Sequence, residues 1–406
     1  MDFNRYRDVL AERVGRLQPP FDDTEYARRR HAVSTAMTTA GLDALLVTDA
    51  ADICYLTGYN TFEVSVHTAL LLTGAGAGGP DGQAILQVPS IETGPAVTTA
   101  RVDNVLGYRW EEADGAVGQM VSALVDLGMR ECRLGTDNWG PALRSGFRDG
   151  LAAALPGVER VDASGLIDGV KIIKSDPEIA LLRESARITE IGIAAAESLI
   201  APGVTDQQLA ATGSAAMLAA GSEFMSLQPI VTTGWRSSVI HCNHQRHAVA
   251  TNEVVFLEFG SAVHRYTAPM MRTRVAGEPS TAMREVADVI RGIYAALLEH
   301  MRPGVTMDAA AAAADTALQP VADRVFFSGV YGYTVGIQFP PSWVEASGYI
   351  ARGVERPFEA NMVFHLPLML RVPGEWGIGM SNTVRVTAEG GEALTDNDLM
   401  LRGLGD

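Results

Sequence analysis

The stretch VKIIKSDPEIALLRESARITEIGIAAAESLI, residues 170–200, separates two parts of the sequence that differ in pattern. Ser175, followed three residues later by Glu178, is the signature of a capping box at the start of a helix. The apolar residues that follow recur at helical spacing and predict a long amphipathic helix. A chain of 406 residues is also too long for one small core. We therefore expect two domains, spanning residues 1–168 and 169–406.

Upstream of this helix, predicted helices alternate with short apolar runs. The helical pattern is found in EYARRRHAVSTAMTTAGL (25–42) and VGQMVSALVDLGM (117–129). Buried strands are predicted at DALLVTD (43–49), HTALLLTG (67–74) and QAILQVP (83–89). Such alternation is typical of an α/β domain, which we expect for this smaller part.

Downstream, a second helix is followed by strand-like segments and two further helices. Helices that flank a largely antiparallel sheet indicate the α+β fold class for this part. An alanine run within 309–314 is predicted to lie on a helix surface. The helices are predicted at 205–221, 280–302 and 307–318, and the strand-like segments at 331–340, 361–371 and 377–388.

The composition and charge limit the class of partner. Hydrophobic residues make up 47% and charged residues 20% of the chain, as in globular proteins, and the formal net charge is −16. Such an acidic chain repels nucleic acid and anionic membranes, so we expect neither as a partner. No apolar run is long enough to span a bilayer, and no signal peptide is recognised. Cys54, Cys132 and Cys242 lack metal-binding spacing and fit a reducing environment, so we expect a cytoplasmic protein.

Several common catalytic motifs are absent from the sequence. It contains no GxGxxG after a strand, no GxxxxGK[ST] and no GxSxG. The glycine-rich TGAGAGGPDG, residues 73–82, joins two predicted strands and is interpreted as a hairpin loop. The sequence therefore favours neither a phosphate-binding loop nor a serine hydrolase of the nucleophile-elbow type.

A lone carboxylate lies in the predicted strand pair VVFLEFGSAVHRYTAPMMRTRVAG, residues 254–277. Apolar residues surround Glu258, and a buried carboxylate is costly unless it has a partner or a task. One interpretation is an ion pair with Arg272 or Arg274 on the next strand, and the other is a role in an active site. The nearby cluster HCNHQRH (241–247) is interpreted as a polar lid loop, with a metal site as the alternative.

A family resemblance is carried by six segments: ADICYLTGY (51–59), VKIIKSDPEIALLRESARI (170–188), LQPIVTTGWRSSVIHCN (227–243), NEVVFLEFGSAVHRYTAPMMRTRVAG (252–277), ANMVFHLPLML (360–370) and WGIGMSNTVRVTAEGGEALT (376–395). Together they resemble the superfamily of creatinase and the proline-specific peptidases over nearly the whole chain. The resemblance implies a pita-bread C-terminal domain preceded by a smaller creatinase-like α/β domain. We also expect a homodimer.

The resemblance also bears on metal binding. The peptidases of the superfamily hold two metal ions with two Asp, one His and two Glu, and hard divalent ions need such a donor set. A single carboxylate remains at the matching positions, so we expect no metal, no other cofactor and no two-metal mechanism. The matching residues are Glu258, Pro269, Tyr333, Pro367, and Ser381 or Asn382.

The departures from the peptidase pattern are similar to those of ectoine hydrolase. RYTAPMMRT (265–273), GYTVGIQFPPSWVEA (332–346) and MVFHLPLML (362–370) carry this similarity. Ectoine hydrolase and the metal-free creatinase break C–N bonds in small amidine or guanidine compounds, so the resemblance implies this chemistry and a small-molecule substrate. The segment WGIGMSN (376–382) stands where ectoine hydrolase carries acids, which leaves the substrate open.

The resemblance assigns three catalytic candidates. His241 lies in the loop where the family places its catalytic histidine, and an imidazole is suited to take a proton from water. Glu258 would pair with an amidinium or guanidinium, or orient water. The Tyr333 hydroxyl would donate a hydrogen bond to a developing charge. The alternatives are an exposed loop histidine, a structural carboxylate and a packed aromatic side chain, respectively.

Four residues of the C-terminal domain are candidates for substrate binding. Arg272 would clamp a carboxylate, and Trp343 would line the pocket through a cation–π contact. Glu345 would bind a cationic group or hold a turn, and His365 is either a ligand or a core histidine.

Two aromatic residues of the N-terminal domain complete the candidates for substrate binding. Tyr59 and Phe62 lie in a region that reaches the active site of the partner subunit in relatives, where they would close the pocket. The alternative is a hydrophobic dimer contact.

Three other functions stay open. The first is a non-hydrolytic biosynthetic enzyme that uses His241 as a proton shuttle for elimination or cyclisation. The second is a non-catalytic pita-bread module that binds peptides or proteins, marked by an exposed groove with His241 unpaired. The third is a metallopeptidase with an altered site.

Overall fold

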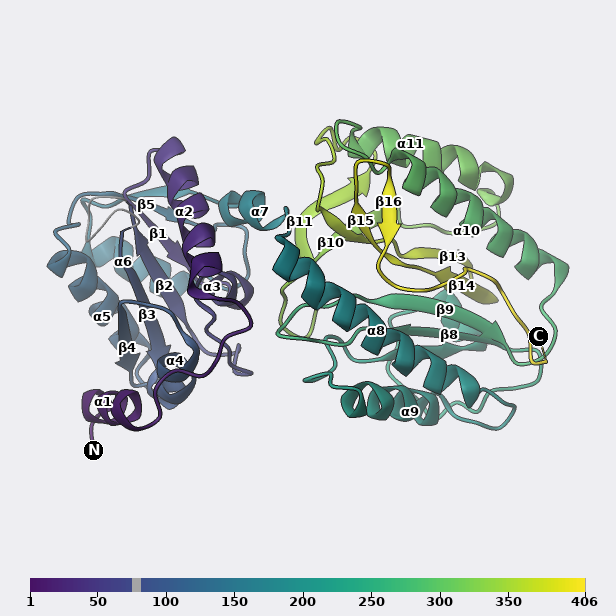
Figure 1. The fold of residues 1–406 in the computed structure, drawn as a ribbon, viewed down its shortest axis with the longest axis horizontal. Coiled ribbons are helices and arrows are strands. Elements are labelled where there is room, and N and C mark those ends of the chain that lie inside the picture. The colour runs from purple at the N-terminus through teal and green to yellow at the C-terminus, as the bar shows by residue number, and fades with distance from the viewer. Residues whose placement is uncertain (75–81, 406) are drawn as a thin grey trace. The chain divides into compact units, whose positions relative to one another are not determined.

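The protein, described here by a computed structural model over residues 1–74 and 82–405, divides into two compact units. The N-terminal unit spans Met1–Val170 and the C-terminal unit spans Lys171–Asp406 (Figure 1). Each unit has its own sheets and its own hydrophobic core.

The N-terminal unit is built on one six-stranded mixed sheet, with strand order β4-β3-β2-β1-β5-β6. Strand β1 pairs in parallel with β5 and antiparallel with β2, and the β3–β4 and β5–β6 pairs are parallel. The strands predicted from the three apolar runs are β1, β2 and β3, and every residue of these strands is buried. The strands are β1 (Ala44–Val47), β2 (Ala69–Thr73), β3 (Ala84–Pro89), β4 (Asn104–Tyr108), β5 (Arg133–Thr136) and β6 (Glu159–Asp162).

Helices connect these strands, as the α/β prediction requires. Helix α2 begins after its N-cap Asp22, buries Tyr26, Val33 and Met37, and ends before Gly41, whose φ of 65° suits glycine. Strands β2 and β3 pair antiparallel, but most of the glycine-rich loop predicted between them lies outside the described residues. The helices are α1 (Phe3–Arg13), α2 (Asp23–Thr39), α3 (Ala50–Thr57), η1 (Ser90–Glu92), α4 (Thr93–Thr99), α5 (Ala113–Asp126), α6 (Ser145–Ala154) and α7 (Leu166–Lys171).

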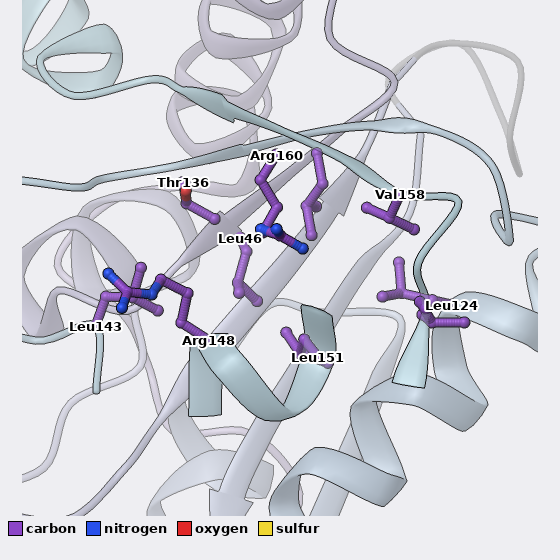
Figure 2. A pocket seen from close by; sticks show the side chains of 10 residues that line it. Leu46, Leu124, Thr136, Leu143, Arg148, Leu151, Val158 and Arg160 are labelled. Atoms are coloured by element: carbon purple, nitrogen blue, oxygen red, sulfur yellow. The ribbon is translucent and has the colours of Figure 1, made fainter. Parts of the chain in front are cut away.

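A small cavity of about 10 Å³ lies in the core of the N-terminal unit (Figure 2). Leu46 of β1, Leu124 of α5 and Leu151 of α6 line it, together with Arg148 and Arg160. This volume suits at most one water molecule, whereas a ligand site needs roughly 300 Å³ or more. The cavity is therefore a packing gap and not a substrate site.

The C-terminal unit has two helix pairs with strands between them (Figure 1). Helix α8 begins at Ser175, and the predicted capping box with Glu178 is present. No helix within residues 1–74 or 82–405 combines the length and the apolar composition needed to cross a bilayer. The helices are α8 (Asp176–Ser198), α9 (Asp206–Ala219), η2 (Gly234–Ser238), α10 (Thr281–His300), α11 (Met307–Leu318) and η3 (Gln319–Val321).

The sheets of this unit are antiparallel throughout, which confirms the α+β prediction. They form a three-stranded sheet β7-β8-β9, a two-stranded sheet β13-β14 and a five-stranded sheet β11-β10-β12-β15-β16. The strands are β7 (Ile230–Thr233), β8 (Val254–Phe259), β9 (Met270–Val275), β10 (Val330–Val335), β11 (Val344–Ala351), β12 (Val363–His365), β13 (Leu368–Val372), β14 (Trp376–Met380), β15 (Thr383–Val386) and β16 (Gly391–Ala393).

The alanine run of α11 lies only in part on the predicted helix surface, since Ala309, Ala312 and Ala313 are half-buried. Ala310, Ala311 and Ala314 are fully buried in the core that α10 and α11 share with the five-stranded sheet. Small side chains let two helices approach closely, so the run serves helix packing. The other face of the unit is closed by α8 and α9, which pack on β7, β8 and β9.

Candidate active site

A cavity of about 670 Å³ lies in the C-terminal unit, and its floor is the sheet β7-β8-β9. In this sheet Ile230 is directly opposite Glu258, and Glu258 is directly opposite Met271. Directly opposite residues of antiparallel strands point to the same face, so these three side chains form one row. All three line the cavity, which places a carboxyl group in the middle of an apolar floor.

Strand β13 forms one wall of the cavity. Pro367, Met369 and Arg371 line it, and residues that alternate along a strand point to one face. Pro367 directly precedes β13, and Arg371 is its last residue but one. The remaining walls come from β10, from the turn before β11 and from the loop after η2, and include Tyr333, Ser342, Trp343 and residues 239–243.

Glu258 is the unusual group of the cavity. Its side chain is 2% exposed, and Oε2 has no hydrogen-bond partner in the described part of the chain. Burial raises the pKa of the Glu258 carboxyl from its ordinary 4.5 to about 8. The alternative interpretation, an ion pair with Arg272 or Arg274, is wrong because both guanidinium groups bond to Glu197. At neutral pH, Glu258 is therefore mostly a protonated acid.

Tyr333 is held from two sides by buried groups. The indole Nε1–H of Trp343 donates to its hydroxyl oxygen at 2.8 Å, and Nδ1 of His365 lies 2.8 Å from the same oxygen. The second ring nitrogen of His365 lies 2.6 Å from Ser381 Oγ, which accepts a hydrogen bond from the Met271 N–H at 2.6 Å. This chain of hydrogen bonds fixes the Tyr333 ring at the cavity wall.

The number of protons that Tyr333, His365 and Ser381 share decides which group donates in each of these hydrogen bonds. Burial lowers the pKa of His365 to about 3, so its ring is neutral and carries one N–H. If Nε2 carried that proton, the Ser381 hydroxyl proton would have no acceptor among the described residues, although Ser381 is fully buried. Because an unpaired buried donor is costly, we assign the proton to Nδ1 and let Ser381 donate to Nε2. The Tyr333 hydroxyl proton is then free to point into the cavity.

The Tyr333 hydroxyl keeps its proton at neutral pH and acts as a hydrogen-bond donor, not as a base. Burial and the neighbouring Glu258 raise the pKa of Tyr333 well above its ordinary value of 10, so the hydroxyl stays neutral. With its oxygen accepting from Trp343 and His365, its own O–H is oriented as a donor toward the cavity. Such a preorganised donor can stabilise negative charge that develops on a bound substrate.

His241 lies on an exposed loop at the rim of the cavity. Its imidazole has no hydrogen-bond partner among residues 1–74 and 82–405. The loop is fixed from below by the buried ion pair of Arg236 Nη1 with Asp206 Oδ2 at 2.8 Å. Arg236 also donates to the Asn243 carbonyl oxygen, and the Gln245 N–H donates to Asp206 Oδ2 at 2.9 Å.

The electrostatics of Asp206 favour this arrangement. Burial acts to raise the pKa of Asp206, but the hydrogen bonds from Gln245 and Arg236 hold it below its ordinary value. The carboxylate thus stays charged at neutral pH and anchors the backbone that carries His241. Asp206 and Arg236 were not recognised in the sequence because they pair across 30 positions of the chain, and Asp206 accepts from Gln245 across 39 positions.

The other two histidines of the loop do not form a metal site with His241. His244 Nε2 lies 3.0 Å from the Pro229 carbonyl oxygen, and His247 Nε2 lies 3.1 Å from Glu253 Oε1. Each ring is therefore engaged with its own partner, which favours the lid-loop interpretation over the metal site.

The residues at the peptidase metal positions do not fit a metal centre. Only Glu258 offers a carboxylate, while Pro269 and Pro367 offer no side-chain donor and the Tyr333 hydroxyl is protonated. No three His, Cys, Asp or Glu side chains gather as a metal-binding group within the residues that the structure describes. There is also no room for an acid at Gly379, because a Cβ there would lie 2.4 Å from a ring carbon of Phe256. The donor set therefore argues against a dinuclear centre in this cavity.

The structure corrects the prediction for Arg272. Because Glu258 is opposite Met271, the next residue Arg272 points to the other face of the sheet. There its guanidinium bonds to Glu197 at 2.8 Å and to the Asp396 carbonyl oxygen at 3.1 Å. Arg272 is thus a structural residue on the side of α8, and it cannot clamp a ligand in the cavity.

Two further substrate-binding predictions are corrected in favour of structural roles. Glu345 is buried in an ion pair with Lys174 at 2.7 Å and accepts a hydrogen bond from Ser347, so its charge is already neutralised. His365 is 0% exposed and supports Tyr333 from behind without lining the cavity. Trp343 does line the cavity, and it also orients Tyr333.

Tyr59 and Phe62 belong to the N-terminal unit. Tyr59 is buried, and its hydroxyl donates to Glu92 Oε2 at 3.2 Å, whereas Phe62 is 89% exposed. The engagement of Tyr59 by Glu92 corrects its expected role in closing a pocket. For Phe62, the approach to a partner subunit stays a prediction.

The fold and the cavity together define a creatinase-type pita-bread protein whose C-terminal domain is preceded in the sequence by an α/β domain. Residues 180–388 match the metallopeptidase family M24, and residues 29–173 match the Creatinase/Prolidase N-terminal domain. The chain belongs to metallopeptidase family M24, since that match spans more than half of it. The predicted family and fold are therefore confirmed.

Relatives of similar length carry hydrolase and peptidase names. An uncharacterized hydrolase/peptidase of Sinorhizobium fredii is 28% identical over 94% of this chain and 97% of its own. The ectoine hydrolase of Halomonas elongata is 26% identical over 93% of this chain and 96% of its own. The crystal structure of dipeptidase PepE from Mycobacterium ulcerans superposes with a TM-score of 0.79 at 25% identity, covering 95% of this chain and 99% of that one.

Proposed function

We propose that the protein is a metal-independent hydrolase that cleaves a C–N bond in a small amidine- or guanidine-like metabolite. The observation that supports this most is Glu258, a buried carboxyl that faces the cavity with an unpartnered oxygen in the described chain. Burying such a group costs free energy of folding unless a ligand completes it. A planar amidinium presents two N–H groups that match a carboxylate in a bidentate manner.

In this proposal the three catalytic candidates have separate tasks. Glu258 gives up its proton when the amidinium binds and then holds the two N–H groups, which keeps the central carbon electrophilic. His241 takes a proton from water, and the oxygen forms a bond to that carbon while the C=N electron pair moves to nitrogen. Tyr333 donates a hydrogen bond to the new oxygen. His241 then returns the proton to the leaving nitrogen and the C–N bond breaks. The proton of the new hydroxyl passes to the Glu258 carboxylate as the C=O bond forms, giving an amide or urea and an amine or ammonia.

The relatives support hydrolysis in general. One of them is named as an ectoine hydrolase, and others are named as peptidases. The peptidase route needs metal ligands that Pro269, Tyr333 and Pro367 do not supply. A route through side chains alone is therefore the one that the cavity favours.

The test is a ligand screen followed by product analysis in labelled water. Amidines, guanidines and cyclic imino acids are screened by thermal shift, with and without chelator, because a ligand of the native state raises the melting temperature. Compounds that bind are incubated in ¹⁸O-water, and the product is analysed by mass spectrometry. The proposal predicts one labelled oxygen in the product and none with Glu258→Gln. A product without label would indicate elimination or cyclisation instead.

A second candidate function is a non-catalytic binding module. The observation that favours it is His241, which is exposed and lacks a side-chain partner in the described part of the chain. A general base is usually oriented by another group, although such contacts often form only when substrate binds. Ligands that raise the melting temperature but are recovered unchanged would support this function over hydrolysis.

A further inference from the structure

Tyr333 and Glu258 each present a proton to the same cavity. The Tyr333 oxygen already accepts hydrogen bonds from Trp343 and His365, so its own O–H points into the cavity. Glu258 makes no ion pair, and its Oε2 has no hydrogen-bond partner within the part of the chain that the structure describes. A buried carboxyl without a cation stays neutral and keeps its proton. The cavity is therefore lined by two O–H donors whose protons no described group of the protein accepts.

Packing on both sides brings these two donors to the same part of the cavity. The indole that donates to Tyr333 lies against the backbone two residues beyond Glu258, since a Cβ on Gly260 would lie 3.0 Å from Trp343 Cε3. At its other end, the chain of hydrogen bonds that holds Tyr333 reaches the N–H of Met271, which is directly opposite Glu258. The charge of Glu258 also contributes to the raised pKa of Tyr333. The two O–H groups therefore face a common space.

A fixed pair of O–H donors in an apolar place is suited to hold an oxyanion. The donors are oriented before the ligand arrives, so no reorganisation opposes binding. A carboxylic acid that its apolar site keeps neutral can donate beside a tyrosine in this way. A hydrogen bond to an ionised acceptor is roughly twice as strong as one between neutral groups. Each donor therefore gains more from an ionised oxygen than from a neutral carbonyl or hydroxyl group.

The surroundings of the donor pair indicate the shape and the charge of the ligand. Ile230 and Met271 flank Glu258 on the floor, and Trp343 adds an aromatic ring at the wall. These apolar groups suit a flat ring, and a cavity of about 670 Å³ holds a small molecule. Glu258 is the one carboxyl among the described residues that line the cavity. While it is neutral, the cavity does not repel an anion, although the chain carries a formal charge of −16.

We propose that the cavity binds a small planar phenol or enol as its oxyanion, with the ionised oxygen between the O–H groups of Tyr333 and Glu258. The phenol or enol gives its own proton to solvent, and no covalent bond of the protein changes. The site does not rest on the proposed hydrolysis, because an amidinium needs the carboxylate form of Glu258 and an oxyanion needs the acid form. The two kinds of ligand therefore compete for one cavity in opposite states of Glu258.

Binding of three matched nitroaromatic probes tests the proposal. 4-Nitrophenol supplies the oxyanion, 4-nitroanisole has the same ring without an ionisable group, and 4-nitrobenzoate is an anion with less basic oxygens. By calorimetry at neutral pH, wild type is expected to bind 4-nitrophenol about 10- to 100-fold more tightly than either of the others. Absorbance reports the bound state. At about one pH unit below the pKa of the free phenol, addition of the protein should raise the phenolate band.

Variants separate the two donors from the rest of the cavity. Tyr333→Phe and Glu258→Leu each remove one donor, and leucine fits the apolar row of Ile230 and Met271. Each variant is expected to bind 4-nitrophenol about 10-fold more weakly and to keep its affinity for 4-nitroanisole. Tyr331→Phe, outside the cavity, is the matched control and should bind all three probes as wild type does. Melting temperatures no lower than that of wild type show that a loss of binding is not a loss of folding.

The outcomes separate the donor pair from the proposed reaction. Equal binding of 4-nitrophenol and 4-nitroanisole by wild type, no binding of 4-nitrophenol at millimolar concentration, or a bound phenol without the phenolate band would overturn the donor pair. Tight binding of 4-nitrophenol that survives in both variants, or that 4-nitrobenzoate matches, would overturn it as well. Phenolate binding that depends on both donors, without cleavage of any guanidine, would support the donor pair and refute the hydrolysis. Guanidine cleavage without phenolate binding would refute the donor pair alone.

Discussion

Replacing Glu258 by glutamine is expected to stabilise the protein at neutral pH, which is unusual for a buried residue. The carboxyl has a pKa of about 8 in the native state and an ordinary value of 4.5 when unfolded. Below pH 4.5 both states hold the proton, so this group has no effect on stability. As the pH rises toward 8, the unfolded chain loses its proton first, and the free energy of unfolding falls by about 1.4 kcal/mol per pH unit.

The size of the effect follows from this difference in pKa. At about pH 7, Glu258 costs the native state on the order of 3 kcal/mol relative to a neutral isostere. Glu258→Gln keeps the shape and cannot ionise. We therefore expect a variant that matches wild type at about pH 4 and is roughly 3 kcal/mol more stable at about pH 7.

The assay is urea unfolding followed by tryptophan fluorescence across this pH range. Glu345→Gln is the matched control because Glu345 is equally buried but pairs with Lys174 at 2.7 Å. Leaving Lys174 unpaired is expected to destabilise the protein by about 3–5 kcal/mol, the opposite sign. A Glu258→Gln variant that is less stable than wild type at pH 7, or whose difference does not change with pH, would refute the reasoning.

Three other predictions follow from the same contacts. Tyr333→Phe should lower kcat by roughly 100-fold with little change in KM. The control Tyr331→Phe, which lies outside the cavity, should leave kcat unchanged. Equal kcat values for wild type and Tyr333→Phe would contradict the donor role. Asp206→Ala should cost about 3–5 kcal/mol and speed amide hydrogen exchange at Gln245, because the buried Arg236 loses its partner; unchanged exchange would show that the His241 loop is held otherwise. Binding of an amidine at about pH 7 should release about one proton, measured by calorimetry in buffers of different ionisation enthalpy, and Glu258→Gln should release none.

Elements with strong local signals could be predicted from the sequence. The capping box at Ser175 and the apolar strands β1, β2 and β3 lie where expected because each signal is made by neighbouring residues. Strand β11 (Val344–Ala351) was missed, since its sequence VEASGYIA contains a glycine and lacks a clear alternation. It is a strand because of its pairing with β10, which includes register shifts, and Ala346 has a φ of 63°.

The candidate site could be predicted only in part. Family motifs mark the positions of His241, Glu258, Tyr333 and Trp343, so these residues could be predicted. All four line one cavity. The role of Arg272 was wrongly predicted because the face of β9 to which its side chain points depends on the register of β9 with β8, and the local sequence does not give that register.

Long-range partners account for the remaining errors. The ion pair between Lys174 and Glu345 joins residues 171 positions apart, so the structural role of Glu345 could not be recognised from neighbouring residues. The position of Arg371 at the cavity was not predicted for a similar reason. It depends on which face of β13 lines the cavity, and the local sequence does not show this.

The rate of C–N cleavage before and after removal of metal tests the central claim most directly. Ammonia or amine release from the tightest-binding amidine or guanidine is measured with the protein as purified, after dialysis against chelator, and after addition of Mn²⁺. The account predicts the same rate in all three samples, since Glu258, Tyr333 and His241 supply the chemistry. A rate that is lost on chelation and restored by Mn²⁺, or no cleavage of any compound that binds, would contradict it.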